Sequence, residues 1–74
     1  MKYLIKGAER CTYCVHAKNL LESKSLPYEW VNIDINEEAR NELKTAGFRT
    51  IPQIWHGESH IGGYAELLSY LGDN

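Results

Sequence analysis

An alternating segment between two helical patterns is the feature that most constrains how this chain folds. Residues 28–35 alternate as a strand does, with Val31, Ile33 and Ile35 on one face and Tyr28, Trp30 and Asn32 on the other. Residues 12–24 before it and residues 37–46 after it have apolar side chains at helical spacing. A strand at residues 2–6 precedes the first helix. Strand, helix and strand in this order predict a right-handed parallel unit.

The remainder of the chain predicts a hairpin and a last helix. We expect a helix from Thr12 that Pro27 closes, then a strand over 28–35, and then a helix over 37–46 with Asn36 as N-cap and Gly47 as its stop. A third strand follows Pro52 and runs through Ile54 and Trp55, and a turn at 56–59 leads to a very short strand at 60–61. The last helix begins after Gly62-Gly63 and ends at Gly72. We therefore expect one α/β domain over residues 1–74 in the order β-α-β-α-β-β-α, with a four-stranded mixed sheet and helices on both of its faces.

Composition agrees with one small folded domain and argues against two classes of protein. Hydrophobic residues make up 43% of the 74 residues, as in globular chains. No apolar run approaches the roughly 20 residues of a membrane span, and Lys2 and Lys6 interrupt the first apolar residues too early for a signal peptide. A net charge of −2 argues against a generic nucleic-acid binder. We expect a cytoplasmic monomer with neither a membrane nor a nucleic acid as partner.

The two cysteines, Cys11 and Cys14, carry the expected chemistry. They lie at the junction of the first strand and first helix, and their spacing lets both sulfurs meet within one helical turn. Unpaired backbone N–H groups and the helix dipole stabilise a thiolate on Cys11, and Arg10 adds positive charge. Cys14 lies on the apolar stripe, so we expect it to be less exposed and more protonated. This asymmetry predicts that Cys11 attacks a disulfide and that Cys14 resolves the mixed disulfide.

Two other interpretations of the cysteine pair stay open. The pair is half of a zinc site if His16, His56 or His60 supplies nitrogen ligands. Structural zinc sites usually have a second Cys-x-x-Cys or a spaced histidine pair, and the turn between His56 and His60 prevents a shared helical face. A purely structural disulfide closes only a tiny loop here and is rare in cytosolic proteins. Redox chemistry is therefore the favoured interpretation, and no metal is expected.

Two further motifs bring a known family into view. Residues 50–55 read Thr-Ile-Pro-Gln-Ile-Trp, and residues 60–67 read His-Ile-Gly-Gly-Tyr-Ala-Glu-Leu. Together with Cys-Thr-Tyr-Cys and the order of elements, they make the chain resemble a dithiol glutaredoxin of the thioredoxin superfamily, from Tyr3 to about Leu71. The resemblance implies a thioredoxin-like fold of the glutaredoxin type and thiol–disulfide exchange with glutathione as reductant.

The resemblance also implies where glutathione lies. A cis Ile51–Pro52 bond would place the Ile51 backbone to pair with the cysteinyl part of the tripeptide. The helix that follows Gly63 would hold the γ-glutamyl carboxylate at its N-terminus, with Glu66 near the amino group. The full set of expected glutathione-binding residues is Arg10, Tyr13, Arg49, Thr50, Ile51, Pro52, Gly63, Tyr64, Ala65 and Glu66.

Three positions depart from the family pattern. Ala8 stands where a lysine is common, Thr12 replaces a proline, and Ala65 replaces a threonine or serine that helps to bind the carboxylate. The glutathione site therefore has fewer side-chain contacts, although its backbone contacts are kept. Nearby candidates for the missing cation are Lys6, Arg10 and Arg49.

The leading functional hypothesis is a glutathione-dependent oxidoreductase that reduces protein disulfides and glutathione mixed disulfides, with ribonucleotide reductase among the clients that the resemblance suggests. An alternative is a glutaredoxin-like hydrogen donor recharged by thioredoxin reductase, although such relatives depart from the Ile-Gly-Gly stretch that this chain keeps. A third is an iron–sulfur cluster carrier. Carriers commonly have a single active-site cysteine or a small residue after it, which Thr12-Tyr13-Cys14 matches poorly.

Overall fold

The structure, a computed structural model, describes residues 1–72 of the chain. Its elements are β1 (Tyr3–Gly7), α1 (Thr12–Ser23), β2 (Tyr28–Asn32), α2 (Glu37–Thr45), β3 (Gln53–His56), β4 (Ser59–Gly62) and α3 (Tyr64–Leu71). The expected order β-α-β-α-β-β-α is confirmed. None of the helices within residues 1–72 is long and apolar enough to cross a membrane.

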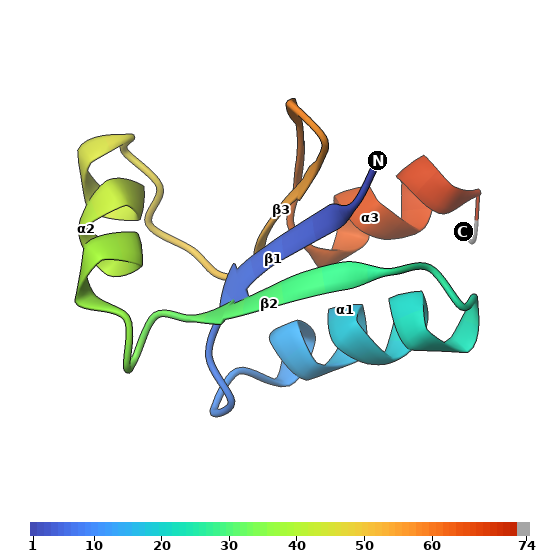
Figure 1. The fold of residues 1–74 in the computed structure, drawn as a ribbon, viewed down its shortest axis with the longest axis horizontal. Helices are drawn as coiled ribbons and strands as arrows, with labels where there is room; N and C mark the ends of the chain where they lie inside the picture. The colour runs from blue at the N-terminus through green and yellow to red at the C-terminus, as the bar shows by residue number, and fades with distance from the viewer. Residues whose placement is uncertain (73–74) are drawn as a thin grey trace.

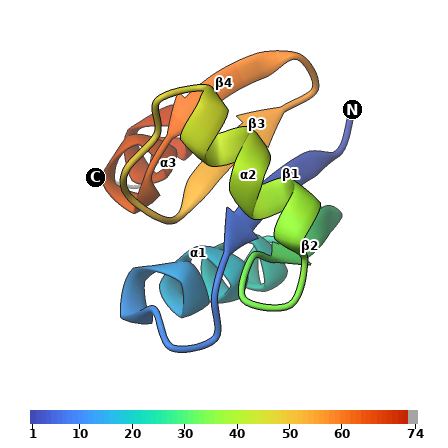
Figure 2. The same ribbon diagram turned by 90° about the vertical axis from the view of Figure 1, so that its left-hand side faces the viewer.

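The strands form one four-stranded mixed sheet in the order β2-β1-β3-β4. Strands β1 and β2 are parallel, as expected for a strand–helix–strand unit, whereas β3 pairs antiparallel with both β1 and β4. Helix α2 lies on one face of the sheet, and α1 and α3 lie on the other (Figures 1 and 2). This is the predicted arrangement of helices on both faces.

Each face of the sheet has its own apolar cluster. The larger cluster lies under α1 and α3 and consists of Tyr3, Ile5, Ala17, Leu21, Ile54 and Leu67. The smaller one lies under α2 and consists of Ile33, Ala39 and Leu43, with Val31, Phe48, Ile51 and Trp55 packed against it. The alternation of the second strand accounts for this division, because Trp30 packs on the first cluster and Val31 on the second.

The predicted strand over residues 28–35 is too long. Strand β2 ends at Asn32, whose side-chain oxygen accepts a hydrogen bond from the Asp34 backbone N–H at 2.9 Å. The Asn32 carbonyl also accepts from Ile35 N at 3.2 Å, which closes a turn. Ile33 still reaches the cluster under α2, but Ile35 is 85% exposed. Local side-chain to backbone bonds of asparagine thus replace the sheet ladder.

Helix boundaries differ from the expectations by a few residues. Helix α1 ends at Ser23 rather than running up to Pro27, because Ser25 has a left-handed φ of 57°. Helix α2 ends at Thr45, so Ala46 is exposed instead of completing the apolar stripe. The expected stop at Gly47 is present, with a positive φ of 86°.

Strand pairing brings three distant segments to one end of the sheet. In the antiparallel pair, Lys6 near the end of β1 lies opposite Gln53 at the start of β3. The loop before α1 therefore lies beside the loop before β3. Gly62 at the end of β4 pairs with Ile54, so the start of α3 lies at this end as well.

Candidate functional site

Cys11 is the N-cap of α1, at the first of these three segments. Its Sγ accepts a hydrogen bond from the Cys14 backbone N–H, with a sulfur–nitrogen distance of 3.2 Å. A thiolate accepts such a bond better than a neutral thiol does, and the helix dipole acts in the same direction. Cys11 is also partly exposed, whereas Cys14 is not. The local geometry therefore favours Cys11 as the reactive sulfur.

Cys14 lies one turn further along α1 and is 0% exposed, in agreement with its expected burial. Burial is the main cause that raises the pKa of the Cys14 thiol to about 12, and its hydrogen bond with Cys11 adds to the shift. The Cys14 thiol, which lies next to Cys11, therefore stays protonated at neutral pH. Such an environment suits a second, resolving thiol rather than a first nucleophile.

Gly7 is a site residue that sequence reasoning missed. A Cβ at this position would lie 2.5 Å from Cys14 Sγ and 3.1 Å from Cys14 Cβ. Strand β1 therefore needs a glycine at its end so that the buried thiol fits. The available signal was a glycine directly after the predicted strand over residues 2–6 and four positions before Cys11.

The loop before β3 is the second segment of the site. The Ile51–Pro52 peptide bond is cis, as the resemblance implies. The Ile51 carbonyl oxygen lies 3.7 Å from Cys11 Sγ. The buried Gln53 side chain holds this loop, since its Nε2 donates to the Thr50 carbonyl at 2.9 Å and to the Thr50 hydroxyl at 3.2 Å. The Ile51 backbone is thereby fixed beside the reactive sulfur.

The start of α3 is the third segment. Gly62 has a φ of 122°, which only glycine adopts readily, and Gly63 is the N-cap. Glu66 folds back over the helix start, where its Oε1 accepts from Gly63 N at 2.8 Å. This first turn lines the same hollow as Tyr13 and Ile51, and its other backbone N–H groups suit an anion.

One groove joins the three segments. It has a volume of about 420 Å³ and is lined by Tyr13, Thr50, Ile51, Pro52, Gly63, Tyr64, Ala65, Glu66 and Leu68. All of the expected glutathione contacts except Arg10 and Arg49 are therefore brought together. Leu68 was not expected, although its position one helical turn after Tyr64 is a signal for it.

Aromatic rings form one wall of this groove. Tyr13 is 62% exposed and stacks on Tyr64, with 5.9 Å between the ring centroids. His16 completes the group, and its ring centroid lies 5.6 Å from that of Tyr64. Tyr64 thus packs over the site and against the first turns of α1.

The expected replacement cations mostly point elsewhere. Arg10 Nε and Nη2 each donate a hydrogen bond to the Asp34 carboxylate at 3.0 Å. This hydrogen bonding raises the pKa of Arg10. Lys6 forms an ion pair with Glu42 at 3.1 Å, on the α2 side of the sheet. Arg49 lines a different pocket, described below. Ala8 is fully buried. Within residues 1–72, the groove therefore offers a ligand carboxylate chiefly backbone N–H groups rather than basic side chains.

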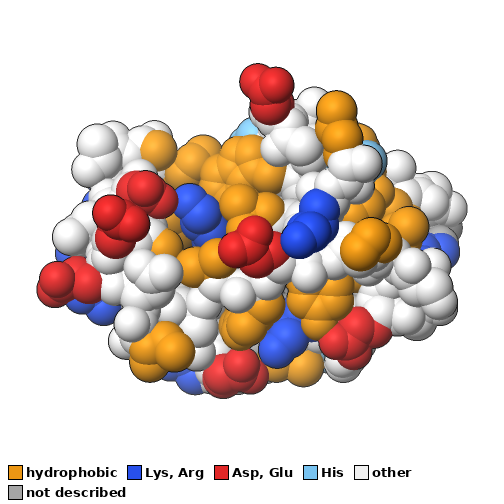
Figure 3. Space-filling model, viewed as in Figure 1, with side chains coloured by type: hydrophobic (Ala, Val, Ile, Leu, Met, Phe, Trp, Pro, Cys, Tyr) orange, Lys and Arg blue, Asp and Glu red, His pale blue; other side chains and the backbone are white. Residues whose placement is uncertain are grey.

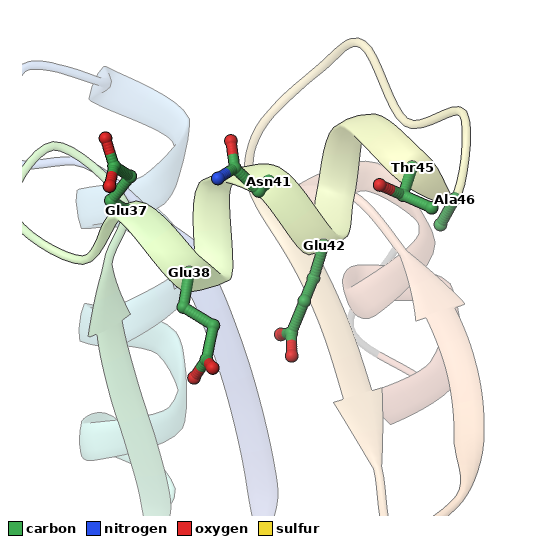
Figure 4. Close-up of a pocket in the computed structure, with 6 residues that line it drawn as sticks. All are labelled: Glu37, Glu38, Asn41, Glu42, Thr45 and Ala46. Carbon is green, nitrogen blue, oxygen red and sulfur yellow. The ribbon is translucent and has the colours of Figure 1, made fainter.

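A second depression, on the outer face of α2, does not share these features (Figure 4). Its volume is about 650 Å³, and it is lined only by α2 and the residue after it: Glu37, Glu38, Asn41, Glu42, Thr45 and Ala46. Acidic side chains cover α2, while hydrophobic side chains gather between α2 and the β3–β4 hairpin (Figure 3). Neither cysteine lines this depression, and its carboxylates oppose the binding of an anion.

The residues of the zinc interpretation do not come together. Within residues 1–72, no group of three or more His, Cys, Asp or Glu side chains is arranged to hold a metal ion. His56 Nδ1 instead lies 2.7 Å from the Tyr70 hydroxyl, and His60 Nε2 lies 2.8 Å from Gln53 Oε1.

Known proteins match both the sequence and the fold. The family model for glutaredoxin matches residues 1–61. A glutaredoxin of Pseudomonas aeruginosa is 45% identical over 58 residues, which cover 77% of this chain and 69% of the relative. Glutaredoxin 3 of Escherichia coli K12 is 43% identical over 62 residues, or 82% of this chain and 75% of the relative.

A solved structure extends the match to nearly the whole chain. The glutaredoxin-like protein NrdH-redoxin from Escherichia coli, which has a thioredoxin-like activity profile, superimposes with a TM-score of 0.84. The two chains are 26% identical, and the match covers 96% of this chain and 95% of the other.

Proposed function

This chain belongs to the glutaredoxin family, and from that premise we propose that it is a glutathione-dependent oxidoreductase that reduces protein disulfides and glutathione mixed disulfides. One observation carries the proposal. Cys11 lies beside a groove that combines the Ile51 backbone with the N-terminus of α3. The groove volume of about 420 Å³ falls within the usual range for small-molecule sites.

The cysteines supply the exchange chemistry. The Cys11 thiolate attacks one sulfur of a client disulfide, so that a Cys11–client disulfide forms and one client thiolate leaves. Cys14 then loses its proton and attacks Cys11 Sγ, which releases the second client thiolate and forms the Cys11–Cys14 disulfide. Two glutathione thiolates restore the dithiol in turn, and one molecule of oxidised glutathione leaves. The client thus gains the two electrons that the two glutathione molecules lose.

The groove offers complementary partners to the parts of glutathione. The Ile51 backbone precedes β3 and is available to pair with the cysteinyl residue as an added strand does. The first turn of α3 favours the γ-glutamyl carboxylate, and the Glu66 carboxylate lies where it attracts the amino group. Ala65 contributes no hydroxyl, so we expect backbone donors to supply most of the affinity.

A recycling assay tests this function. Oxidation of NADPH is followed with a small glutathione mixed disulfide as substrate, once with glutathione and glutathione reductase and once with thioredoxin reductase alone. We expect turnover only in the first case. The Cys11→Ser variant serves as control and should be inactive in both. Turnover restricted to thioredoxin reductase would overturn the role of glutathione while leaving the thiol chemistry intact.

That alternative is the second candidate function, and the NrdH-redoxin match favours it. The match covers 95% of that chain, and its described profile is thioredoxin-like. Ala8 and Ala65, which remove two side-chain contacts for glutathione, point the same way. The retained Gly62-Gly63 pair and the groove beside it favour glutathione, and we therefore place glutathione first.

The proposal also includes a client and a location in the cell. Ribonucleotide reductase is a proposed client, on the strength of the family resemblance. A cytoplasmic location is proposed because a glutathione-reduced dithiol is useful in a reducing compartment.

A further inference from the structure

All the basic side chains of the second half of the chain line one pocket. Residues 25–74 contain three of them, Arg40, Lys44 and Arg49, among eight acidic residues. All three border a pocket of about 290 Å³ between α2 and the loop before β3. We call it the basic pocket. Its apolar lining includes Ile33, Leu43 and Phe48.

The charge of the basic pocket is largely uncompensated. Arg40 is held in place, because its Nη1 donates to the Ile33 carbonyl at 3.4 Å and its Nη2 lies 3.7 Å from Glu37. Lys44 and Arg49 are exposed, and no acidic side chain within residues 1–72 forms an ion pair with either. Two of the three cations are therefore available to an incoming carboxylate.

The basic pocket includes part of the loop that lies beside Cys11. The basic pocket shares Thr50 and Ile51 with the groove proposed above for glutathione. The loop before β3 therefore contributes to both. The Ile51 carbonyl lies 3.7 Å from Cys11 Sγ. An extended peptide advances about 3.3 Å per residue, so a client bound at Cys11 reaches the pocket within a few residues of its cysteine.

We propose that the basic pocket binds a protein client through a bulky apolar residue and an adjacent Asp or Glu, both close to the reducible disulfide of the client. The inference rests on the proposed oxidoreductase function and specifies which class of client protein this chain reduces. Ile33 and Leu43 provide a buried apolar floor for the first side chain, and Lys44 and Arg49 face the second. Glutathione has no apolar side chain to fill such a floor.

The neighbouring surface restricts the binding mode. The outer face of α2 carries Glu37, Glu38 and Glu42 (Figure 4). Glu37 and Glu42 pair with Arg40 and Lys6, so Glu38 is the carboxylate there that chiefly repels a client carboxylate. The pocket itself is therefore the favourable position for that carboxylate on this side of the molecule. Electrostatic complementarity of this kind governs the association rate and the choice of partner more than the affinity.

Peptide disulfides test the inference. Three peptides share one scaffold, and the residues beside the cysteine are Leu-Asp, Leu-Lys or Ser-Asp. Their reduction by the dithiol protein is measured under single-turnover conditions, at low and at high salt. We expect the Leu-Asp peptide to react about three to ten times faster than either of the others, and its advantage over Leu-Lys to shrink at high salt. Equal rates for the three peptides would overturn the proposal.

Variants show whether the pocket is responsible. Lys44→Gln should reduce the preference for Leu-Asp over Leu-Lys, and Lys44→Glu should abolish or reverse it. Lys2→Glu is the matched control, because it makes the same charge change at an exposed position outside the pocket. An equal effect of Lys2→Glu would mean that net charge, not the pocket, selects the peptide. Thermal melting verifies that each variant is folded.

Glutathione kinetics separate this inference from the proposed function. If recycling with glutathione fails but the peptide preference holds, the proposed function is wrong and the client site stands. If Lys44→Glu raises the KM for glutathione as much as it slows the Leu-Asp peptide, the pocket takes a glutathione carboxylate and the client site is wrong.

Discussion

At the scale of single residues, the two cysteines differ in environment more than in sequence. Cys11 is partly exposed, and its sulfur accepts a hydrogen bond from a backbone N–H. Cys14 is buried, and its raised pKa keeps it protonated. Position within the helix produces this contrast, because an N-cap residue faces the helix end and a residue one turn later faces the core.

The contrast predicts different losses for two conservative substitutions. Cys11→Ser should abolish reduction of every disulfide. Cys14→Ser should retain reduction of small glutathione mixed disulfides, which need only the attack by Cys11, and lose at least about tenfold in reduction of protein disulfides, which need resolution. Both are measured by NADPH-coupled turnover with each substrate. A Cys14→Ser protein equally inactive on both substrates would contradict the assigned roles.

The sequence predicts these two environments but not the charges around them. The cysteine spacing and the helix start predict an N-cap position for Cys11 and burial for Cys14 with no knowledge of the sheet. Arg10 was expected to stabilise the thiolate, yet it forms two hydrogen bonds with the carboxylate of Asp34, which lies 24 positions further along the chain. A side chain's ion-pair partner depends on which loops the fold brings together, and local patterns do not contain that information.

At the scale of elements, the packing of β1 against α1 depends on Gly7. We predict that Gly7→Ala destabilises the reduced protein by about 1–3 kcal/mol, because the new methyl group overlaps Cys14 Sγ. Urea unfolding in the presence of a reductant measures the loss.

A double-mutant cycle identifies the cause of that loss. In a Cys14→Ala background the sulfur is absent, so adding Gly7→Ala should cost clearly less than it does in the natural sequence. An unchanged cost would assign the effect to the two contacts that remain in this background, the Cβ of residue 14 at 3.1 Å and the Trp30 ring at 3.2 Å from the new methyl carbon.

The start of α2 gives an independent test of element stability. Asn36 Oδ1 accepts from the Ala39 N–H at 3.0 Å, as expected for an N-cap. Asn36→Ala should therefore lower the free energy of unfolding by about 0.5–2 kcal/mol. Asn41→Ala, an exposed position within the same helix, is the control and should change it by no more than about 0.5 kcal/mol. Equal losses for the two variants would remove the capping argument.

The end of β2 shows where reasoning about elements fails. Apolar alternation continues through Ile35, but Asn32 closes a turn with its own side chain and backbone. Alternation indicates which residues suit a strand, whereas the last ladder bond depends on whether a partner strand continues beside it. Strand β1 ends at Gly7, opposite Asn32, so the last bond to it runs from Ile33 N to the Gly7 carbonyl at 2.8 Å, and Ile35 lies beyond its end.

At the scale of the whole molecule, topology assembles the site. The periodicity of the sequence predicts the order of the elements, and that order predicts the hairpin and the parallel unit. The meeting of the three site segments follows from the central positions of β1 and β3 and from their antiparallel pairing. Periodicity does not give that strand order. The family motifs supplied the residues expected to contact glutathione, and the fold brings most of these residues to one groove.

Burial of a thiol in the core also links the stability of the whole fold to pH. The folded protein raises the pKa of Cys14 from its ordinary 9.0 to about 12, so between these values the unfolded chain loses a proton that the folded chain keeps. Unfolding then releases a proton, and the free energy of unfolding falls as pH rises, by at most about 1.4 kcal/mol per pH unit. The stabilising contribution is complete below pH 9 and is lost as pH approaches 12.

Thermal melts of the reduced protein at half-unit steps from pH 8 to pH 10 measure this effect. We predict that the natural protein loses Tm faster than Cys14→Ala does above pH 9, although the variant is less stable at pH 8 because of its cavity. Tyr28, whose hydrogen bond to Glu22 raises its pKa from 10.0 to about 12, begins to ionise in the unfolded chain one pH unit higher than Cys14, so Tyr28→Phe should change the slope from pH 9 to 10 less than Cys14→Ala does. Parallel curves for the natural protein and Cys14→Ala would show that the thiol titrates alike in the folded and unfolded chains. The buried, protonated state of the resolving cysteine would then be wrong.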